Sequence, residues 1–382
     1  MTKKKMKILM IIPNFFPYYS NAGGAERQCL KLSRRLLKIK VDVDVLTYRR
    51  KLEWPTYDII NGIKIRRLPY FAPNEMNLPV WLFFLLKNRN NYDIFHVHLF
   101  NGVHFVAASW VARFFKKPII VKIAGSGENF DAIKTKRLRW PLRIWIFQSL
   151  ILSTKIVAIS NSIKKELQEL QIPDSQIISI PNGVEIVGPT QDYKKIQQRK
   201  NLGIPEDTTV ILTVGNLTPN KGIKYLLVAW DQVRKKWPKS LLVSVGGKKL
   251  PYFCQEADKD PNSQVKFFLN QDSVLPFLQS ADIFILPSIA EGLSNALLEA
   301  QACGLPCIAS RVGGNSDIIS DNINGILIEP RSVEQIKVAL EKLMSSKELQ
   351  TFYGKNAIIK AQLYDIRNIA KEYLLLYDSL RC

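Results

Sequence analysis

Residues 287–314 read PSIAEGLSNALLEAQACGLPCIASRVGG, and the apolar run DIFIL at 282–286 comes directly before them. The apolar run predicts a buried strand. Gly292 predicts a tight turn after that strand, and Ser294 is a typical N-cap for the helix that follows. A second apolar run after the helix predicts another strand. The stretch is therefore typical of one strand, helix and strand unit of a parallel sheet.

The start of this helix has the features of an anion site between two carboxylates. The first amides, at Asn295 and Ala296, have no acceptor within a helix, and the helix dipole is positive at this end. Glu291 and Glu299 can accept hydrogen bonds from hydroxyls on either side. An anion with hydroxyls around it describes a nucleotide sugar. Taken alone, such a pair in a chain with 33 acidic residues is more often two solvated surface carboxylates.

Length and composition indicate two globular domains and an attraction for polyanions. A chain of 382 residues is longer than a domain with a single hydrophobic core usually is. A content of 47% hydrophobic and 23% charged residues excludes a disordered chain. The 54 basic and 33 acidic residues give a net charge of +21. Such an excess attracts nucleic acid, an anionic membrane or phosphorylated substrates, and composition does not choose among them.

Apolar runs alternate with helical patterns along the chain, which predicts two doubly wound parallel sheets. The predicted strands are residues 7–12, 41–47, 93–97, 118–121 and 155–160, then 210–215, 241–246, 265–268, 282–286 and 306–310. The turn at 181–183 and the polar run 188–198 predict a domain boundary. We expect domains at 1–187 and 188–363, followed by a final helix at 364–382.

The cysteines and the N-terminus favour a cytoplasmic protein without a transmembrane segment. The five cysteines are odd in number and lack metal-site spacing, which suits a reducing compartment. The first apolar run stops at Pro13, too early for a signal peptide, and no apolar stretch reaches the roughly 20 residues that span a bilayer.

Other segments could carry chemistry. Gly23 and Gly24 follow the first strand, where backbone can approach a ligand, although a simple loop turn explains them too. Lys221, in VGNLTPNKG at 214–222, would lie at the carboxyl edge of the second sheet and could neutralise a diphosphate, or be one solvated lysine of many. His96 and His98 lack a third ligand, so we expect no metal site there.

Three of these segments resemble motifs of glycosyltransferase family 4, the retaining enzymes of the GT-B fold. Residues 287–314 resemble its donor-site signature, GGAERQCLKLS from Gly23 resembles its N-terminal glycine loop, and VGNLTPNKG resembles its phosphate clamp. The resemblance implies an α/β protein with two Rossmann-like doubly wound domains facing a central cleft. It places the acceptor on the first domain and the donor on the second, and it returns the final helix to the first domain.

The resemblance also implies roles for single residues. Glu291 and Lys221 would be catalytic, with Glu291 on a sugar hydroxyl and Lys221 on the departing diphosphate. Glu299 would hold the nucleotide ribose. The implied donor-binding residues are Gly23, Gly24, Asn216, Leu293, Ser294, Asn295, Ala296 and Glu299. Neither a metal nor another cofactor is expected.

The chain departs from the family pattern at three positions. Asn216 stands where many members carry the arginine of the phosphate clamp, and Ala124 stands where many carry a histidine near the transferred sugar. Asp317 replaces a glutamate and is expected to shape its loop.

The expected function is retaining transfer of a hexose from a nucleotide diphosphate sugar to a hydroxyl, in polysaccharide, lipopolysaccharide or glycolipid biosynthesis. The acceptor would be a glycan or a lipid-linked molecule. Segments 76–89 and 134–152 mix basic and aromatic residues, which suits peripheral contact with an anionic inner membrane face, although a helix packing on the core explains them equally. No RNA-binding signature is present, so no nucleic acid partner is expected. A nucleotide-sugar epimerase and a basic binding protein without catalysis remain alternatives.

Overall fold

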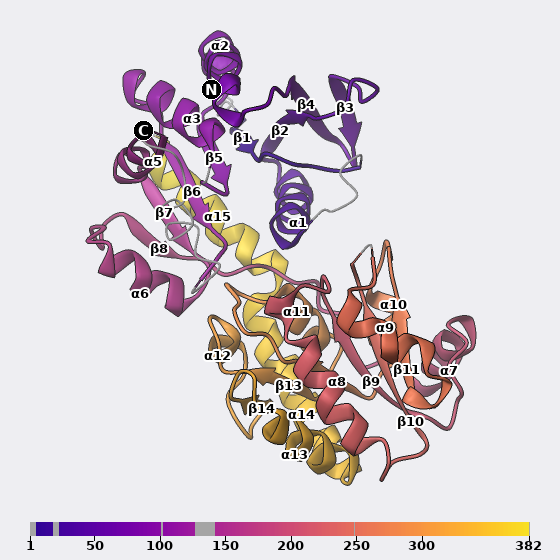
Figure 1. The fold of residues 1–382 in the computed structure, drawn as a ribbon. Coiled ribbons are helices and arrows are strands. Elements are labelled where there is room, and N and C mark those ends of the chain that lie inside the picture. Colours follow the sequence, from indigo (N-terminus) through magenta and orange to yellow (C-terminus); the bar gives the residue numbers. More distant parts are fainter. Residues whose placement is uncertain (1–4, 18–22, 101, 127–141, 248, 382) are drawn as a thin grey trace. The chain divides into compact units, whose positions relative to one another are not determined.

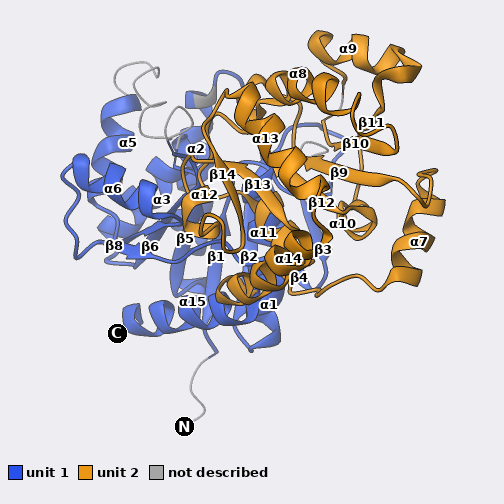
Figure 2. Ribbon diagram, turned by 90° about the horizontal axis from the view of Figure 1, so that it is seen from below, with its two compact units in different colours: residues 1–183, 366–382 blue, residues 184–365 orange. Residues whose placement is uncertain are grey.

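The computed structural model describes residues 5–17, 23–100, 102–126, 142–247 and 249–381 (Figure 1). The chain forms two compact α/β units (Figure 2). Unit 1 comprises residues 1–183 and 366–382, and unit 2 comprises residues 184–365.

Within the described residues, unit 1 has an eight-stranded sheet in the order β3-β4-β2-β1-β5-β6-β7-β8. All neighbours are parallel except β3 and β4. The strands are β1 (Lys7–Ile11), β2 (Asp42–Arg49), β3 (Tyr57–Ile60), β4 (Ile63–Pro69), β5 (Ile94–His98), β6 (Ile119–Ile123), β7 (Lys155–Ala158) and β8 (Ile177–Ser179). The helices are α1 (Gly24–Lys38), α2 (Leu78–Asn88), α3 (Val103–Phe114), α5 (Leu142–Ile151), α6 (Asn161–Glu169) and α15 (Ile366–Leu380).

Unit 2 has, among the described residues, a six-stranded parallel sheet in the order β11-β10-β9-β12-β13-β14. Its strands are β9 (Thr209–Val214), β10 (Ser240–Val245), β11 (Val265–Phe268), β12 (Ile283–Leu286), β13 (Cys307–Ser310) and β14 (Gly325–Ile328). Its helices are α7 (Asp192–Asn201), α8 (Ile223–Val233), α9 (Tyr252–Lys259), α10 (Leu275–Ser280), α11 (Asn295–Ala302), α12 (Asn315–Ile318), α13 (Val333–Met344) and α14 (Lys347–Ala361).

All ten predicted strands are present, with ends shifted by a few residues. Four further strands were not predicted, namely β3, β4, β8 and β14. The β3–β4 pair is a hairpin whose turn contains Asn61 and Gly62, both with positive φ. An Asn-Gly turn is a strong hairpin signal, so this pair was readable from the sequence.

Gly183, the last residue of the first segment of unit 1, is held by helix α1 and lies against the start of α15. The side chain of Gln28 donates to the Gly183 carbonyl at 2.9 Å and accepts from its amide at 3.1 Å. A Cβ on Gly183 would lie 2.4 Å from Ile366 Cδ1, so only glycine lets α15 begin at this point.

A buried polar cluster joins β5 and β6 of unit 1 to α15. The rings of His96 and His98 stack with centroids 4.5 Å apart, and His96 Nδ1 lies 2.7 Å from the Tyr377 hydroxyl. Lys122 Nζ lies 5.6 Å from the centre of the Tyr373 ring. Burial lowers the pKa of His96 to about 3 and that of Lys122 to about 8. The histidine pair is thus a neutral part of the packing.

Acid should destabilise unit 1 through its histidines, because all three of the chain lie in it and are buried. Burial lowers the pKa of His96 to about 3, that of His104 to about 4 and that of His98 well below the ordinary 6.5. The unfolded chain therefore binds more protons below pH 6.5, and stability is lost as the pH falls through that value. At pH 5 His96 and His104 should each cost about 2 kcal/mol.

Urea unfolding of the full chain at pH 7.5 and pH 5 measures this loss. His104 Nε2 lies 2.8 Å from the Leu99 carbonyl, and glutamine can keep a donor there without titrating. His104→Gln should therefore lose less stability between the two pH values than the wild type does. An identical loss in both proteins would contradict the assignment.

Candidate active site

Three loops of unit 2 meet at the carboxyl ends of β9, β12 and β13. In this sheet β9 and β12 are neighbours, but the chain runs from β9 to β10 on one side and from β12 to β13 on the other. Such a switch point is where doubly wound sheets bind ligands. The loop after β12 is tied to the loop after β9 by the Ile289 amide, which donates to the Asn220 carbonyl at 2.7 Å. It is tied to the loop after β13 by the Gly314 amide, which donates to the Gly292 carbonyl at 2.9 Å.

Two glycines permit this close approach. Gly222 has φ +68°, and a Cβ there would lie 1.8 Å from the Pro287 carbonyl oxygen. Gly313 has φ +50°, and a Cβ there would lie 1.8 Å from the Glu291 carbonyl oxygen. Gly292 itself is not among the residues with positive φ. The close approaches that require glycine at this edge of the sheet thus include Gly222 and Gly313, on the two neighbouring loops.

Lys221 and Glu291 are in direct contact at this edge of the sheet. Lys221 Nζ donates to Glu291 Oε1 at 2.5 Å, and the Ser288 hydroxyl donates to the same oxygen at 2.7 Å. Glu291 is only 8% exposed, and Ser288 is fully buried. Glu291 Oε2 takes no bond from the described residues, which leaves it to accept a hydrogen bond from a ligand.

The helix start lies beside this pair. Ser294 caps α11 as predicted, because its hydroxyl accepts from the Leu297 amide at 3.3 Å. Asn295 and Ala296 form the first turn of α11, where helix amides and the helix dipole favour an anion. Leu293 is buried in the preceding loop, and Glu299 lies one turn along the helix, half-buried.

The remaining predicted residues fall in two places. Asn216 is exposed in the loop after β9, the same loop as Lys221. Gly23 and Gly24 belong to unit 1, where Gly23 caps α1 and its amide donates to Glu26 Oε2 at 2.9 Å. Ala124 is half-buried directly after β6. The structure therefore brings the unit 2 residues together and sets the glycine pair at a helix start of unit 1.

Sequence reasoning missed Ser288, Gly222 and Gly313. Ser288 lies three residues before Glu291 on the same loop, so the sequence shows that the two residues are near each other along the chain. Their hydrogen bond depends on the conformation of the loop, which the sequence does not show. Gly222 and Gly313 leave room for the backbone of the loop after β12, and neither glycine lies on that loop. Asp317 is half-buried, and its carbonyl accepts from the Tyr364 hydroxyl at 2.9 Å.

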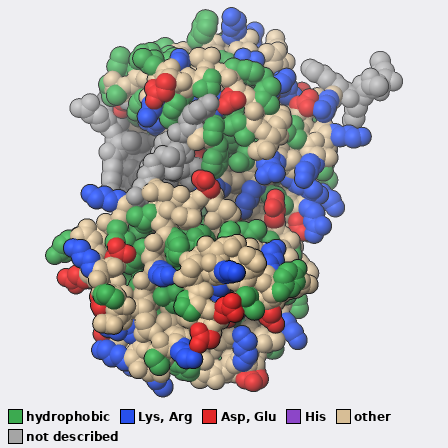
Figure 3. Space-filling model, turned by 90° about the vertical axis from the view of Figure 1, so that its right-hand side faces the viewer, with side chains coloured by type: hydrophobic (Ala, Val, Ile, Leu, Met, Phe, Trp, Pro, Cys, Tyr) green, Lys and Arg blue, Asp and Glu red, His purple; other side chains and the backbone are tan. Residues whose placement is uncertain are grey.

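Neither a metal cluster nor a membrane span stands out in the described part of the chain. No group of three or more His, Cys, Asp or Glu side chains there could hold a metal ion. Every helix among those residues is too short or too polar to cross a bilayer. The four cysteines in that part of the chain are buried and free, and Cys382 lies outside it. Lysine and arginine side chains are spread over the face drawn in Figure 3.

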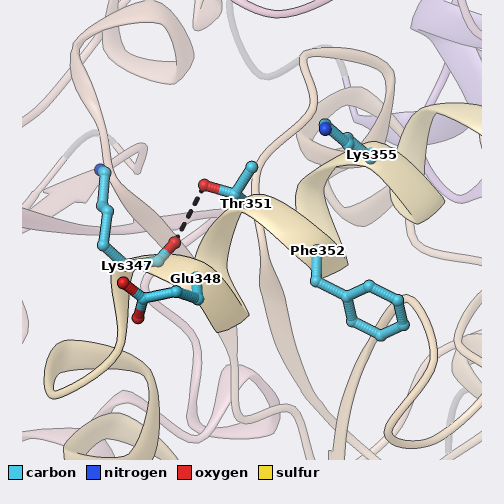
Figure 4. Close-up of a pocket in the computed structure, with 5 residues that line it drawn as sticks. All are labelled: Lys347, Glu348, Thr351, Phe352 and Lys355. Atoms are coloured by element: carbon cyan, nitrogen blue, oxygen red, sulfur yellow. Dashed lines mark hydrogen bonds between the residues drawn. The ribbon is translucent and has the colours of Figure 1, made fainter.

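A hollow of about 450 Å³ lies elsewhere, over the first turns of α14 (Figure 4). It is lined by Lys347, Glu348, Thr351, Phe352 and Lys355. One helix supplies the whole lining, and the Thr351 hydroxyl donates to the Lys347 carbonyl of the same helix at 2.9 Å. It contains none of the predicted site residues.

Two family models match the chain. The model of glycosyl transferases group 1 matches residues 194–360, and the model of Glycosyltransferase Family 4 matches residues 22–187. The chain belongs to glycosyltransferase family 4. It has the GT-B fold, with two Rossmann-like domains built on parallel sheets.

Relatives and a solved structure agree with this membership. An uncharacterized glycosyltransferase of Methanocaldococcus jannaschii is 27% identical over 97% of this chain and 98% of its own length. The UDP-Gal:alpha-D-GlcNAc-diphosphoundecaprenol alpha-1,3-galactosyltransferase of Escherichia coli is 28% identical over 72% of each chain. The Anabaena protein HepE, solved in complex with UDP-glucose, has a TM-score of 0.80 and 18% identity over 98% of this chain and 100% of its own.

Gly222→Ala should destabilise unit 2 far more than Gly188→Ala. Both glycines have positive φ, but a Cβ on Gly188 would meet nothing within 4 Å. Gly188→Ala should cost about 1–2 kcal/mol from the backbone alone. Gly222→Ala adds the overlap with Pro287 and should move Lys221 away from Glu291. Urea unfolding of both variants is the measurement, and equal losses would show that the close approach is not needed.

Proposed function

We propose that this family 4 glycosyltransferase moves a hexose from a nucleotide diphosphate sugar to a hydroxyl of a glycan or lipid-linked acceptor, with retention at the anomeric carbon. The observation that carries the proposal is the contact of Lys221 with Glu291 beside the N-terminus of α11. The named substrates of the Escherichia coli relative and the UDP-glucose bound to HepE support a nucleotide sugar donor and a lipid-linked acceptor.

Each part of the donor has a matching group in unit 2. The diphosphate would sit at the first turn of α11, where the amides of Asn295 and Ala296 and the helix dipole stabilise negative charge. Glu291 Oε2 would accept a hydrogen bond from a sugar hydroxyl. Glu299 would accept hydrogen bonds from the ribose.

Donor binding would change the partner of Lys221. In this structure its ammonium is paired with Glu291, so the diphosphate must share or take over that cation. The ligand hydroxyl compensates by donating to Glu291. Because Asn216 carries no charge, the amides of α11 supply a larger part of the diphosphate stabilisation than in members with an arginine there.

The chemical step needs few protein groups. The bond between the anomeric carbon and the diphosphate oxygen breaks, and the acceptor oxygen bonds to the same face of that carbon. The acceptor proton passes to the departing diphosphate oxygen, so Ala124 in place of a histidine does not prevent the reaction. Lys221 and the α11 amides stabilise the charge that develops on the diphosphate, and on this account no divalent metal or other cofactor is required.

Lys221→Ala should lower kcat by about 100-fold or more, because it removes the cation that stabilises the leaving group. Glu291→Ala should impair transfer through the loss of sugar positioning. Lys224→Ala, on the exposed side of α8, is the matched control and should leave turnover unchanged. Transfer of labelled sugar is measured with and without EDTA, and activity should persist in EDTA.

The same assay tests the two alternatives. If the wild type isomerised a nucleotide sugar without acceptor and transferred none, an epimerase would replace the proposal. If the wild type bound donors without turnover, the chain would be a binding protein. Full activity of both the Lys221 and Glu291 variants would show that the site lies elsewhere.

We also propose that unit 1 contacts an anionic membrane surface through α2, α3 and α5. Helix α3 packs against both other helices, which makes the three helices one group in unit 1 (Figure 1). Its exposed apolar side chains are Phe83, Leu86, Phe114, Ile144, Phe147 and Ile151. Its basic side chains are Lys87, Arg113 and Arg143, and Arg89 directly follows α2. Residues 134–141 of the predicted basic and aromatic segment lie outside the described residues.

Vesicle sedimentation tests the membrane surface. The full chain should bind vesicles that contain phosphatidylglycerol, bind pure phosphatidylcholine vesicles less, and lose binding as salt increases. Phe83→Ser with Phe114→Ser should weaken binding, since these side chains are 68% and 81% exposed. Leu375→Ser on α15, 70% exposed, is the control. Equal binding by all three proteins would overturn the proposal.

A further inference from the structure

Arg50, directly after β2, is an exposed cation held in a fixed orientation. Its guanidinium carbon lies 4.2 Å from the centre of the Tyr70 ring and 5.8 Å from that of the Tyr48 ring. Its Nε donates to Asn14 Oδ1 at 2.7 Å. Asn14 follows β1 and Tyr70 follows β4, so the carboxyl ends of three adjacent strands meet at this arginine.

The aromatic floor under Arg50 is rigid. Tyr48 is 3% exposed, and its ring packs edge-on against Tyr70 and against the fully buried Trp81, with centroids 5.1 Å apart in both contacts. A cation stacked on such rings is attracted by their faces and keeps a fixed plane. The guanidinium is therefore oriented before any ligand arrives.

The loops that carry Arg50 and Asn14 are fixed as well. Arg49 Nε donates to the Trp54 carbonyl at 2.6 Å, which closes the turn after β2. Arg67, 3% exposed, donates to the Phe16 carbonyl at 2.9 Å and so holds the loop after β1. The half-buried Arg49 thus holds the loop after β2, and the buried Arg67 holds the loop after β1.

Among the described residues, Arg50 lacks the acidic partner that its basic neighbours have. Lys51 pairs with Glu53 at 3.4 Å, and Arg67 pairs with Asp58 at 3.6 Å. No carboxylate in the described part of the chain pairs with Arg50, and its two terminal nitrogens donate to none of those residues. Two parallel donors on an oriented guanidinium match two oxygens of one phosphate.

We propose that Arg50 binds a phosphate group of the acceptor, with Asn14, Tyr48 and Tyr70 as its support. The site lies at the carboxyl edge of the unit 1 sheet, the edge at which doubly wound domains bind ligands. The inference rests on the proposed function, in which unit 1 receives the acceptor. It assigns to that acceptor a phosphate or diphosphate in addition to the hydroxyl that is glycosylated.

Calorimetric titration with inorganic pyrophosphate and with farnesyl diphosphate tests the site. The full chain carries Lys221→Ala in every sample, which weakens diphosphate binding in unit 2. Arg50→Ala should weaken binding of both probes by about 10-fold or more, since it removes two charged hydrogen bonds. Lys64→Ala removes the same charge near the amino end of β4 and should change affinity by less than about 2-fold, because its effect is a screened long-range one.

Further variants separate the contribution of the paired guanidinium donors from that of the positive charge. Arg50→Lys keeps the charge but loses the paired donors, so it should bind nearly as weakly as Arg50→Ala. Asn14→Asp leaves Arg50 in place and supplies a competing carboxylate, and it too should bind weakly, which guards against misfolding of the Arg50 variants. An Arg50-dependent preference for farnesyl diphosphate would assign a lipid source, and equal affinities would assign recognition of the phosphate alone.

Unchanged affinity in Arg50→Ala, or equal losses in Arg50→Ala and Lys64→Ala, would overturn the inference. Full binding by Arg50→Lys would overturn the paired-donor geometry. These titrations need no sugar transfer. A failure of the proposed function would appear separately, as absent transfer by the protein with Lys221 intact.

Discussion

The candidate active site of unit 2 depends on the burial of one carboxylate. Glu291 is 8% exposed, and a buried charge is costly unless it is paired and hydrogen-bonded. Lys221 supplies the charge and Ser288 a second donor to the same oxygen. Lys221 lies on the loop after β9, so the pair requires the loops after β9 and β12 to touch, and the left-handed Gly222 makes that approach sterically possible. The start of α11 is then held beside the pair.

The sequence predicted the parts of the fold that depend on local pattern. All ten predicted strands were short apolar runs, and such runs are the primary signal for buried strands. The missed β4 reads IKIRRLP, in which basic residues interrupt the apolar pattern, and its partner β3 is an edge strand with alternating exposure. The turn between them was the available signal. Glu291 and the Ser294 cap were also readable, because strand, turn and helix start are contiguous there.

The contacts that complete the site were not readable from the sequence. Lys221 and Glu291 are 70 residues apart, and their contact depends on β9 and β12 being neighbours. The same holds for Gly222 and Gly313, whose missing side chains make room for backbone on other loops. In unit 1, Arg50 meets Asn14 only because β1 and β2 pair. Motifs identify residues along one segment, whereas sheet order decides which segments meet.

The paired state of Glu291 has a consequence for selectivity in a chain with a net charge of +21. Lysines and arginines on the surface attract any polyanion. In the proposed function, a simple phosphate that takes Lys221 leaves Glu291 with one donor fewer in a buried site, which is unfavourable. A nucleotide sugar brings the phosphate and a hydroxyl that donates to Glu291, so it restores the lost bond. The ion pair thereby favours ligands that carry both groups, and this discrimination arises from the penalty imposed on the wrong ligand.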